Sequence, residues 1–291
     1  MNPYVIFTDS AADLPADLLV RHDIRIVPMI YLINGVEHTH MLTPEGWDFA
    51  SFWAGLHAPD VTVSTSQIIP ATYQDCFAPI LEAGQDVLYC CFSSGLSSTW
   101  QSARIAAQEL AESFPGRKVV CVDTKAATGG QGQFVLAAAE NRANGMTVEE
   151  NAAWLNENCT HFAHWFTVND LDFLKRGGRV SKSVAFFGGK LQIKPIMHVD
   201  EEGKLAIVRK ARGRETSLAQ LAASMQEQLA VSEAPRAWIC HVDAQADAES
   251  LADMIRNFAP DVRVELMPMS PIIAAHTGPG AMALFFWGQG R

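Results

Sequence analysis

The sequence of 291 residues contains no apolar run long enough to cross a lipid bilayer, and its first residues lack the basic and apolar regions of a signal peptide. The six cysteines include no C-x-x-C pair, so the sequence does not favour a zinc site. Positive charge is scarce: 22 Lys and Arg against 32 Asp and Glu give a formal net charge of −10. We therefore expect a cytoplasmic protein with free thiols, no metal and no broad nucleic-acid surface.

Several catalytic motifs are also missing. The sequence has no G-x-S-x-G elbow of a serine hydrolase and no H-E-x-x-H metal motif. The glycine-rich stretch at residues 129–132 resembles a phosphate loop only loosely, because it lacks the Lys-Ser/Thr pair of a Walker motif and the spacing of a dinucleotide fingerprint. We therefore do not expect this stretch to bind a nucleotide.

The order of apolar and amphipathic segments indicates an α/β fold in two lobes. In residues 1–160, apolar strands at 4–8, 24–33, 87–92 and 119–122 alternate with helices at 49–56, 101–110, 132–144 and 147–158. This alternation predicts a parallel sheet covered on both faces. Residues 161–291 have a different rhythm, with a hairpin at about 191–209, which predicts an α+β lobe with a largely antiparallel sheet.

A hydroxyl-rich loop at residues 93–99 is the most informative local feature. It follows a buried strand and precedes a helix, so it gathers backbone N–H groups, hydroxyls and the positive end of a helix dipole. Such a loop suits a small anion, for example a carboxylate. The competing interpretation is an ordinary Ser/Thr helix cap.

Three other segments carry candidate binding residues. Thr65-Ser66-Gln67 forms a second hydroxyl cluster, although a surface turn also explains it. His276 stands in a glycine-rich segment, residues 276–281, whose glycines allow close approach to a ligand. Gly177-Gly178-Arg179 follows a short helix, and a helix cap with a solvated arginine explains it on spacing alone.

In combination these segments resemble the bacterial DegV family from residue 7 to residue 288. The resemblance is carried, in order, by residues 7–15, 65–67, 93–99, 170–181, 193–196 and 276–281. Ile68-Ile69 stand where the family usually has Pro-Ser, while Ser98 replaces a common Gly and Trp100 a common Tyr.

The resemblance implies a protein that binds a long-chain fatty acid and presents it to a separate ATP-dependent fatty-acid kinase for phospholipid synthesis. It implies no cofactor other than the bound acid, and no catalysis by the chain alone. Arg179 would lie on the kinase-facing surface. The residues expected to hold the carboxylate are Thr65, Ser66, Ser93, Ser94, Gly95, Ser97, His276, Thr277 and Gly278.

An apolar tunnel is expected to supply the affinity, with uncharged donors holding the carboxylate. The candidate wall residues, each of which plain core packing also explains, are Phe166, Phe186, Phe187, Ile193, Ile196, Met197, Met267, Met269, Ile272 and Ile273. Two alternatives remain open. The chain could be a phosphoryl- or acyl-transferring enzyme with His276 as base, or it could bind another lipid-like carboxylate such as an isoprenoid acid.

Overall fold

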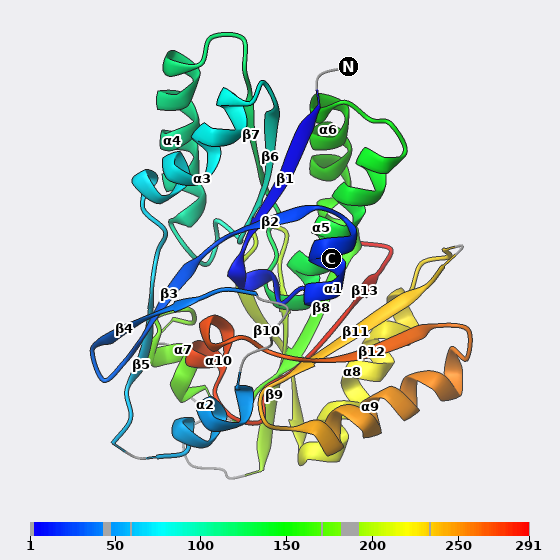
Figure 1. Cartoon of the computed structure of the whole chain (residues 1–291). Coiled ribbons are helices and arrows are strands. Elements are labelled where there is room, and N and C mark those ends of the chain that lie inside the picture. Colours follow the sequence, from blue (N-terminus) through cyan, green and yellow to red (C-terminus); the bar gives the residue numbers. More distant parts are fainter. Residues whose placement is uncertain are drawn as a thin grey trace.

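The computed structural model describes residues 3–42, 48–58, 60–169, 171–181, 192–232 and 234–290, and three β-sheets organise them (Figure 1). The first sheet is fully parallel, with strand order β2-β1-β6-β7. Its strands are β1 (Tyr4–Asp9), β2 (Ile24–Val27), β6 (Asp86–Cys91) and β7 (Val119–Asp123). Helices α3 (Pro70–Glu82) and α4 (Thr99–Ser113) cover one face, and α5 (Thr128–Ala143) and α6 (Val148–Asn158) cover the other. This confirms the predicted parallel sheet.

The second sheet has the strand order β10-β9-β8-β13-β11-β12. All its neighbouring pairs are antiparallel except β11 with β12, which confirms the predicted antiparallel character. Its strands are β8 (Phe162–Thr167), β9 (Ile193–Val199), β10 (Leu205–Arg212), β11 (Arg236–His241), β12 (Arg263–Pro268) and β13 (Met282–Trp287). Helices α8 (Arg214–Gln228) and α9 (Gln245–Phe258) pack on the outer face and form a separate apolar cluster with it. The division of the chain at residue 160 stays a prediction.

Helix α5 lies between the two large sheets and contacts strands of both. Twelve of its sixteen residues are buried, which is why its sequence is rich in Gly and Ala rather than amphipathic. A Cβ at Gly132 would lie 2.7 Å from the Ala12 carbonyl oxygen and from the Trp238 ring. The predicted start at residue 132 was therefore late: residues 129–132 are the first turn of a buried helix, packed too closely for a longer side chain.

The Asn34-Gly35 pair is a hairpin turn signal in the sequence, and it joins β3 (Met29–Ile33) to β4 (Val36–His40). The separate small antiparallel sheet that these strands form with β5 (Val63–Ser66) was not predicted. The predicted strand at residues 24–33 is in fact two strands that belong to different sheets. Pro28 separates them, and it has no N–H to donate to a continuous ladder. Thr65 and Ser66 therefore lie on a strand rather than in a surface turn.

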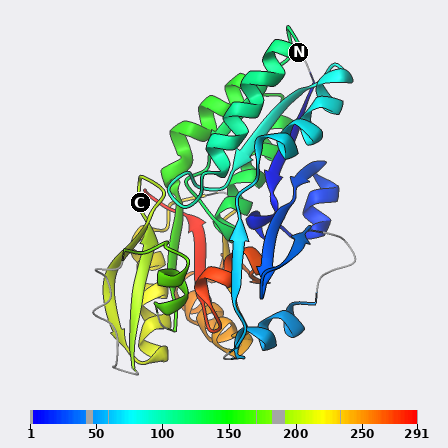
Figure 2. The ribbon, with the colours of Figure 1, turned by 90° about the vertical axis from the view of Figure 1, so that its left-hand side faces the viewer.

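Six short helices connect the larger elements of the described residues, and Figure 2 shows the molecule from a second side. They are η1 (Ser10–Ala12), α1 (Ala16–Arg21), α2 (Phe49–Leu56), η2 (Cys159–His161), α7 (Asp172–Arg176) and α10 (Pro271–Thr277). Helix α10 packs against α2, α7, β3 and β5. The sequence placed His276 in a glycine-rich loop. That placement was wrong, because His276 occupies the last turn of α10.

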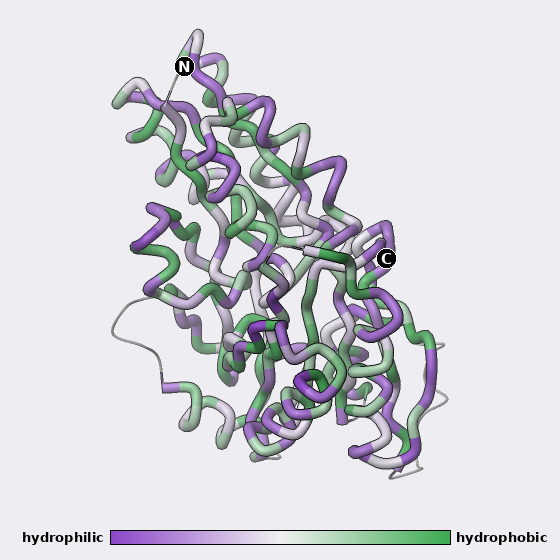
Figure 3. Tube along the Cα trace, turned by 90° about the vertical axis from the view of Figure 1, so that its right-hand side faces the viewer, coloured by the Kyte–Doolittle hydropathy of each residue, from purple (hydrophilic) through white to green (hydrophobic). Residues whose placement is uncertain are grey.

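Hydrophilic and hydrophobic residues alternate along the outer helices (Figure 3), as expected for helices with one buried face. In the described part of the chain no helix is long and apolar enough to span a membrane. Among the same residues, no three His, Cys, Asp or Glu side chains are grouped so that they could hold a metal ion. All six cysteines are free thiols.

Candidate functional site

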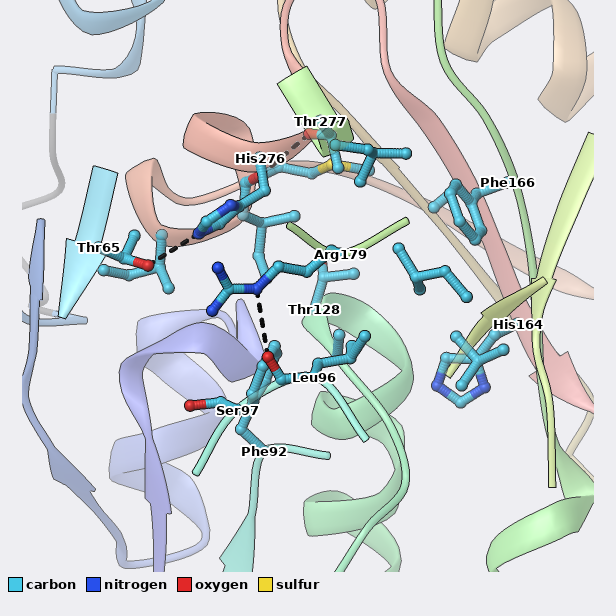
Figure 4. A pocket seen from close by; sticks show the side chains of 18 of the residues that line it. Thr65, Phe92, Leu96, Ser97, Thr128, His164, Phe166, Arg179, His276 and Thr277 are labelled. Carbon is cyan, nitrogen blue, oxygen red and sulfur yellow. Dashed lines mark hydrogen bonds between the residues drawn. The ribbon is translucent and has the colours of Figure 1, made fainter. Parts of the chain in front are cut away.

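A cavity of about 520 Å³ lies where the two lobes and the small sheet meet. It is lined by β5, the loop after β6, the first residues of α5, strands β8 and β13, and helix α10. Its size is within the range of cavities that enclose small organic ligands. Figure 4 shows Thr65, Ser97, Arg179 and His276 on one side of it and His164 and Phe166 on the opposite side. We call these the polar end and the far end.

The polar end is built by three segments that are distant in the sequence. Thr65 comes from β5, Ser97 from the loop before α4, and His276 from the last turn of α10. The Thr65 Oγ1 atom lies 2.8 Å from His276 Nε2. Ser97 Oγ lies 2.8 Å from Thr99 Oγ1 and accepts a hydrogen bond from the Thr99 backbone N–H. Thr65 and Ser97 line the cavity, and Ser97 directly precedes the cap residue at the positive end of helix α4.

His276 is neutral at physiological pH. Burial of the ring, and secondly the charge of Arg179, lower the pKa of His276 from 6.5 to about 4. With Nε2 protonated, the imidazole donates to Thr65 Oγ1, and the Thr65 hydroxyl keeps its own hydrogen for an anion in the cavity. His276 Nδ1 is buried and has no hydrogen-bond partner among the described residues. The pair can therefore relay a hydrogen bond to a carboxylate.

Arg179 changes the expected chemistry of the site. Its Nε donates to the Leu96 carbonyl oxygen at 3.2 Å, and its guanidinium also donates to the Gly177 carbonyl oxygen. The half-buried guanidinium lines the cavity between His276 and Ser97 (Figure 4). Burial lowers the pKa of Arg179, but an arginine remains charged at neutral pH. One cation therefore stands among the uncharged donors expected at this end, and which of them hold a carboxylate stays a prediction.

The hydroxyl-rich loop is held in place by a buried carboxylate at the end of β1. Asp9 Oδ2 accepts hydrogen bonds from the Phe92 backbone N–H at 2.9 Å and from the Tyr89 hydroxyl at 3.0 Å. Asp9 Oδ1 accepts from Gln131 Nε2 and from the Ala11 N–H. Burial raises the pKa of Asp9, while these four donors oppose the rise. Asp9 therefore fixes the loop relative to α5 and β1.

The remaining predicted site residues have different surroundings. Ser66, Ser94, Gly95 and Thr277 line the cavity, although the Ser94 hydroxyl donates to Asp123 at 2.5 Å and the Thr277 hydroxyl donates to the Ile273 carbonyl oxygen. Ser93 and Gly278 do not line the cavity formed by the described residues.

Ser93 and Gly278 instead shape the surrounding backbone. The buried Ser93 hydroxyl donates to the Gly203 carbonyl oxygen at 2.7 Å and thereby ties the loop to the turn between β9 and β10. Gly278 follows α10 with a φ of 74°, a conformation that favours glycine. A Cβ there would also lie 2.4 Å from the Phe173 ring.

The predicted tunnel wall was right in part. Phe166, Met269, Ile272 and Ile273 line the cavity, whereas Ile193, Ile196, Met197 and Met267 do not. Phe186 and Phe187, like Asp170 of the family motif, lie outside the described residues. Sequence reasoning missed other lining residues, among them Thr128, His164, Ala283 and Phe285. Thr128 lies six residues after the predicted strand end at residue 122, which is a weak signal for a binding residue.

We expect Gly177→Ala to weaken anion binding at least about tenfold. A Cβ at this position would lie 2.2 Å from His276 Nδ1, so the ring must shift, which disturbs its hydrogen bond with Thr65. A loss of one hydrogen bond to a charged group is worth about 1.5–3 kcal/mol. Gly55→Ala in α2 is the control, because its added Cβ meets no atom within 4 Å. Equal affinities of the two variants for a carboxylate ligand would show that the His276 ring does not matter.

We expect His276→Asn to reduce the acid sensitivity of the fold. The unfolded chain takes up a proton at pH 6.5 and the folded chain only near pH 4, so the stabilising effect of neutral His276 is complete above pH 6.5 and is lost as the pH falls towards 4. The loss amounts to about 3 kcal/mol. Denaturant unfolding at the two pH values measures it. If the free energy of unfolding falls by the same amount in wild type and variant between the two pH values, the pKa of His276 is not lowered by folding.

Comparisons of this chain with family models and with curated proteins both identify the DegV family. The family described as "Uncharacterised protein, DegV family" matches residues 3–289 of this chain. A DegV domain-containing protein of Clostridium perfringens is 38% identical over 289 residues, which cover 99% of each chain. A DegV domain-containing protein of Lactococcus lactis is 33% identical over 282 residues, 97% of this chain and 96% of that protein.

Solved structures show the same similarity in three dimensions. One of them, from Thermus thermophilus, is described as fatty acid binding of a DegV family protein. It superimposes with a TM-score of 0.87 and 30% sequence identity, and the match covers 99% of this chain and 100% of the Thermus chain. A DegV lipid binding protein from Thermotoga maritima has a TM-score of 0.86 and 28% identity over 99% of both chains.

Proposed function

The chain belongs to the DegV family, and from this we propose that it binds a long-chain fatty acid in the cavity, with the carboxylate at the polar end. The observation that carries the proposal is the cavity itself. Carboxylate partners, namely Thr65, Ser97, Arg179 and neutral His276, stand at one end of a space whose other walls are largely apolar. The Thermus and Thermotoga relatives, described as binding fatty acid and lipid, support it.

The energetics fit a ligand of this kind. Burying about 14 methylenes contributes about 11 kcal/mol at about 0.8 kcal/mol each. Association and ordering of the chain oppose this by several kcal/mol. The apolar walls therefore supply the affinity, and the polar end has to compensate the desolvation of one carboxylate. The Arg179 guanidinium and the Thr65 and Ser97 hydroxyls can do so with charge-assisted hydrogen bonds.

We propose further that the chain presents the bound acid to a separate ATP-dependent fatty-acid kinase. Phosphorylation of a carboxylate requires a site for ATP. The segment most like a phosphate loop, residues 129–132, is buried in the first turn of α5, where a Cβ at Gly129 would already lie 2.7 Å from the Cys240 sulfur. An ATP site on a second protein fits this arrangement. Arg179, which holds Leu96 at the polar end, is the residue proposed to face that partner.

A transferase with His276 as base is the second candidate, favoured by the 2.8 Å contact between His276 Nε2 and the Thr65 hydroxyl. A hydroxyl paired with an imidazole is the usual arrangement for an activated nucleophile. A pKa of about 4 makes this imidazole a weak base, however, and none of the described residues bonds to Nδ1 to orient it. The geometry therefore supports binding better than catalysis.

Mass spectrometry of the extracted protein and a titration test the proposal together. We expect a co-purifying long-chain acid, and saturable uptake of stearic acid after delipidation. An extracted isoprenoid acid would point to the other ligand class, and no saturable uptake of any acid would contradict the proposal. With ATP, the loaded chain should give acyl phosphate only when a fatty-acid kinase subunit is added. Turnover by the chain alone, abolished by His276→Ala, would support the transferase instead.

A further inference from the structure

A second buried carboxylate, Asp13, lies behind the cavity wall and is not used by the site described above. It ends η1 in a left-handed conformation with a φ of 47°, and its residue is only 6% exposed. Asp13 Oδ1 accepts a hydrogen bond from the Ser270 backbone N–H at 3.2 Å. Asp13 Oδ2 accepts one from the Thr128 hydroxyl. One carboxylate thus joins three segments of the chain.

Both donors stand at the beginnings of helices that form the cavity. Ser270 is the cap residue of α10, which contributes Ile272, Ile273 and His276 to the lining. Thr128 begins α5 and itself lines the cavity (Figure 4). The position of α10 relative to α5 decides where His276 lies relative to the far end. Asp13 accepts a hydrogen bond from each helix start and so links the two to each other.

The backbone of Thr128 indicates that this contact matters. Its φ is 46°, a conformation that a β-branched residue adopts only at a cost in free energy. In this conformation the Thr128 hydroxyl donates to Asp13, and Thr128 lines the cavity. Strain of this kind persists only where surrounding contacts enforce it, and the Asp13 hydrogen bond is such a contact.

We propose that Asp13 is a positioning residue of the fatty-acid site, which holds the first turn of α10 and the strained Thr128 in the arrangement that a bound acid requires. This inference rests on the proposed function, because it concerns the same cavity. Asp13 itself does not line the cavity formed by the described residues and does not touch the ligand. Its effect on binding passes through Thr128 and through the placement of His276.

The surroundings of Asp13 add a dependence on pH. Burial and, to a smaller extent, the charge of Asp9 raise the pKa of Asp13 from 3.8 to about 7, against the opposing effect of the hydrogen bonds from Thr128 and Ser270. The titratable groups that face it among the described residues are Asp9 and the buried thiol of Cys240 on β11, whose pKa is itself raised. Asp13 therefore changes charge near neutral pH, with no described cation beside it.

Binding of an acid should favour the protonated form of Asp13. A ligand carboxylate adds a negative charge to the same poorly solvated interior, and like charges raise each other's pKa. Protonated Asp13 can donate to Thr128 Oγ1, so the two residues stay joined in either state. The affinity for an acid is therefore expected to fall as the pH rises through about 7.

The test compares lauric acid binding to wild type, Asp13→Asn and Asp13→Ala at pH values below and above 7. The ratio of wild-type to variant Kd at each pH cancels the titration of the free acid. We expect the ratio of the wild-type Kd to the Asp13→Asn Kd to rise about three- to tenfold from the lower to the higher pH. Asp13 becomes charged over this range, whereas asparagine has the same shape and stays neutral. Asp13→Ala should bind weakly at every pH. Thr128→Val, which removes only the hydroxyl, replaces Asp13→Ala if that variant does not fold.

Asp86→Asn is the matched control. Asp86 is another buried carboxylate, but it pairs with Arg117 and accepts from the Lys118 N–H in the first sheet, away from the cavity lining. Its variant should keep the wild-type pH profile of binding. A wild-type profile in Asp13→Asn, together with wild-type affinity in Asp13→Ala or Thr128→Val, would overturn the positioning role. A wild-type protein that binds no acid at all would instead refute the proposed function.

Discussion

The double variant Thr65→Val, Ser97→Ala binds stearic acid about 100-fold more weakly than wild type, or worse. Each hydroxyl lines the polar end, and each can donate to the ligand carboxylate. A hydrogen bond to a charged group is worth about 1.5–3 kcal/mol, so losing two costs about 3–6 kcal/mol, and about 1.4 kcal/mol corresponds to a factor of ten. Valine also leaves His276 Nε2 without its hydroxyl partner.

Thr62→Val with Ser113→Ala is the matched control for this double variant. Both residues are exposed, their hydroxyls bond to Asn34 and to the Glu109 carbonyl oxygen, and neither lines the cavity. Isothermal titration of delipidated proteins measures the affinities, and circular dichroism checks that all variants are folded. Equal affinities of the two double variants would mean that the carboxylate is held elsewhere.

Ala283→Phe turns the chain towards shorter acids. Ala283 lies on β13 opposite Phe166 of β8, and both residues line the far end of the cavity. A phenyl ring there takes the room of about three methylenes, and each methylene left unburied costs about 0.8 kcal/mol. We therefore expect the affinity for stearic acid to fall about 60-fold.

Chain length supplies the internal control for Ala283→Phe. Lauric acid leaves the far end unfilled, so its affinity should change little. A competition experiment with both acids on the same protein separates this result from a general loss of folding. An equal loss for both acids, or none for stearic acid, would show that the acyl chain does not reach Ala283.

Local sequence patterns predicted the parts of the fold that depend on local signals. The strand before Phe92, the hydroxyl loop and helix α4 follow from an apolar run, a cluster of Ser and a periodic segment that are contiguous in the chain. Helix α2 was predicted with its observed bounds, Phe49–Leu56. These features need no long-range information.

Helices α3 and α10 and the start of α5 were not predicted, because their first residues are not typical of a helix alone. Helices α3 and α10 begin with Pro70 and Pro271, and proline at the first helical position fits a helix as well as it fits a turn. The apolar face of α10 is recognisable only once α2, α7 and β5 surround it. The start of α5 was missed because glycine is a poor helix former, and only the packing between two sheets explains its use there.

Which side of a strand faces the cavity could not be read from composition. Phe166 lines the cavity, whereas Ile196 on the adjacent strand β9 belongs to the outer cluster under α8. The burial of a charged side chain could not be predicted from local sequence either, as Arg179 shows. Gly177-Gly178-Arg179 resembles a solvated helix end, yet a tertiary hydrogen bond to Leu96, together with a local one to Gly177, holds the guanidinium at the cavity.

A crystal structure with 12-bromododecanoic acid shows whether the acid occupies the cavity and which way it lies there, because the anomalous signal of bromine locates the end of the acyl chain. We predict bromine inside the cavity, on the far-end side of the carboxylate, and the carboxylate itself beside Thr65 and His276. Bromine on the protein surface, or a carboxylate at the far end with bromine beside Arg179, would contradict this prediction.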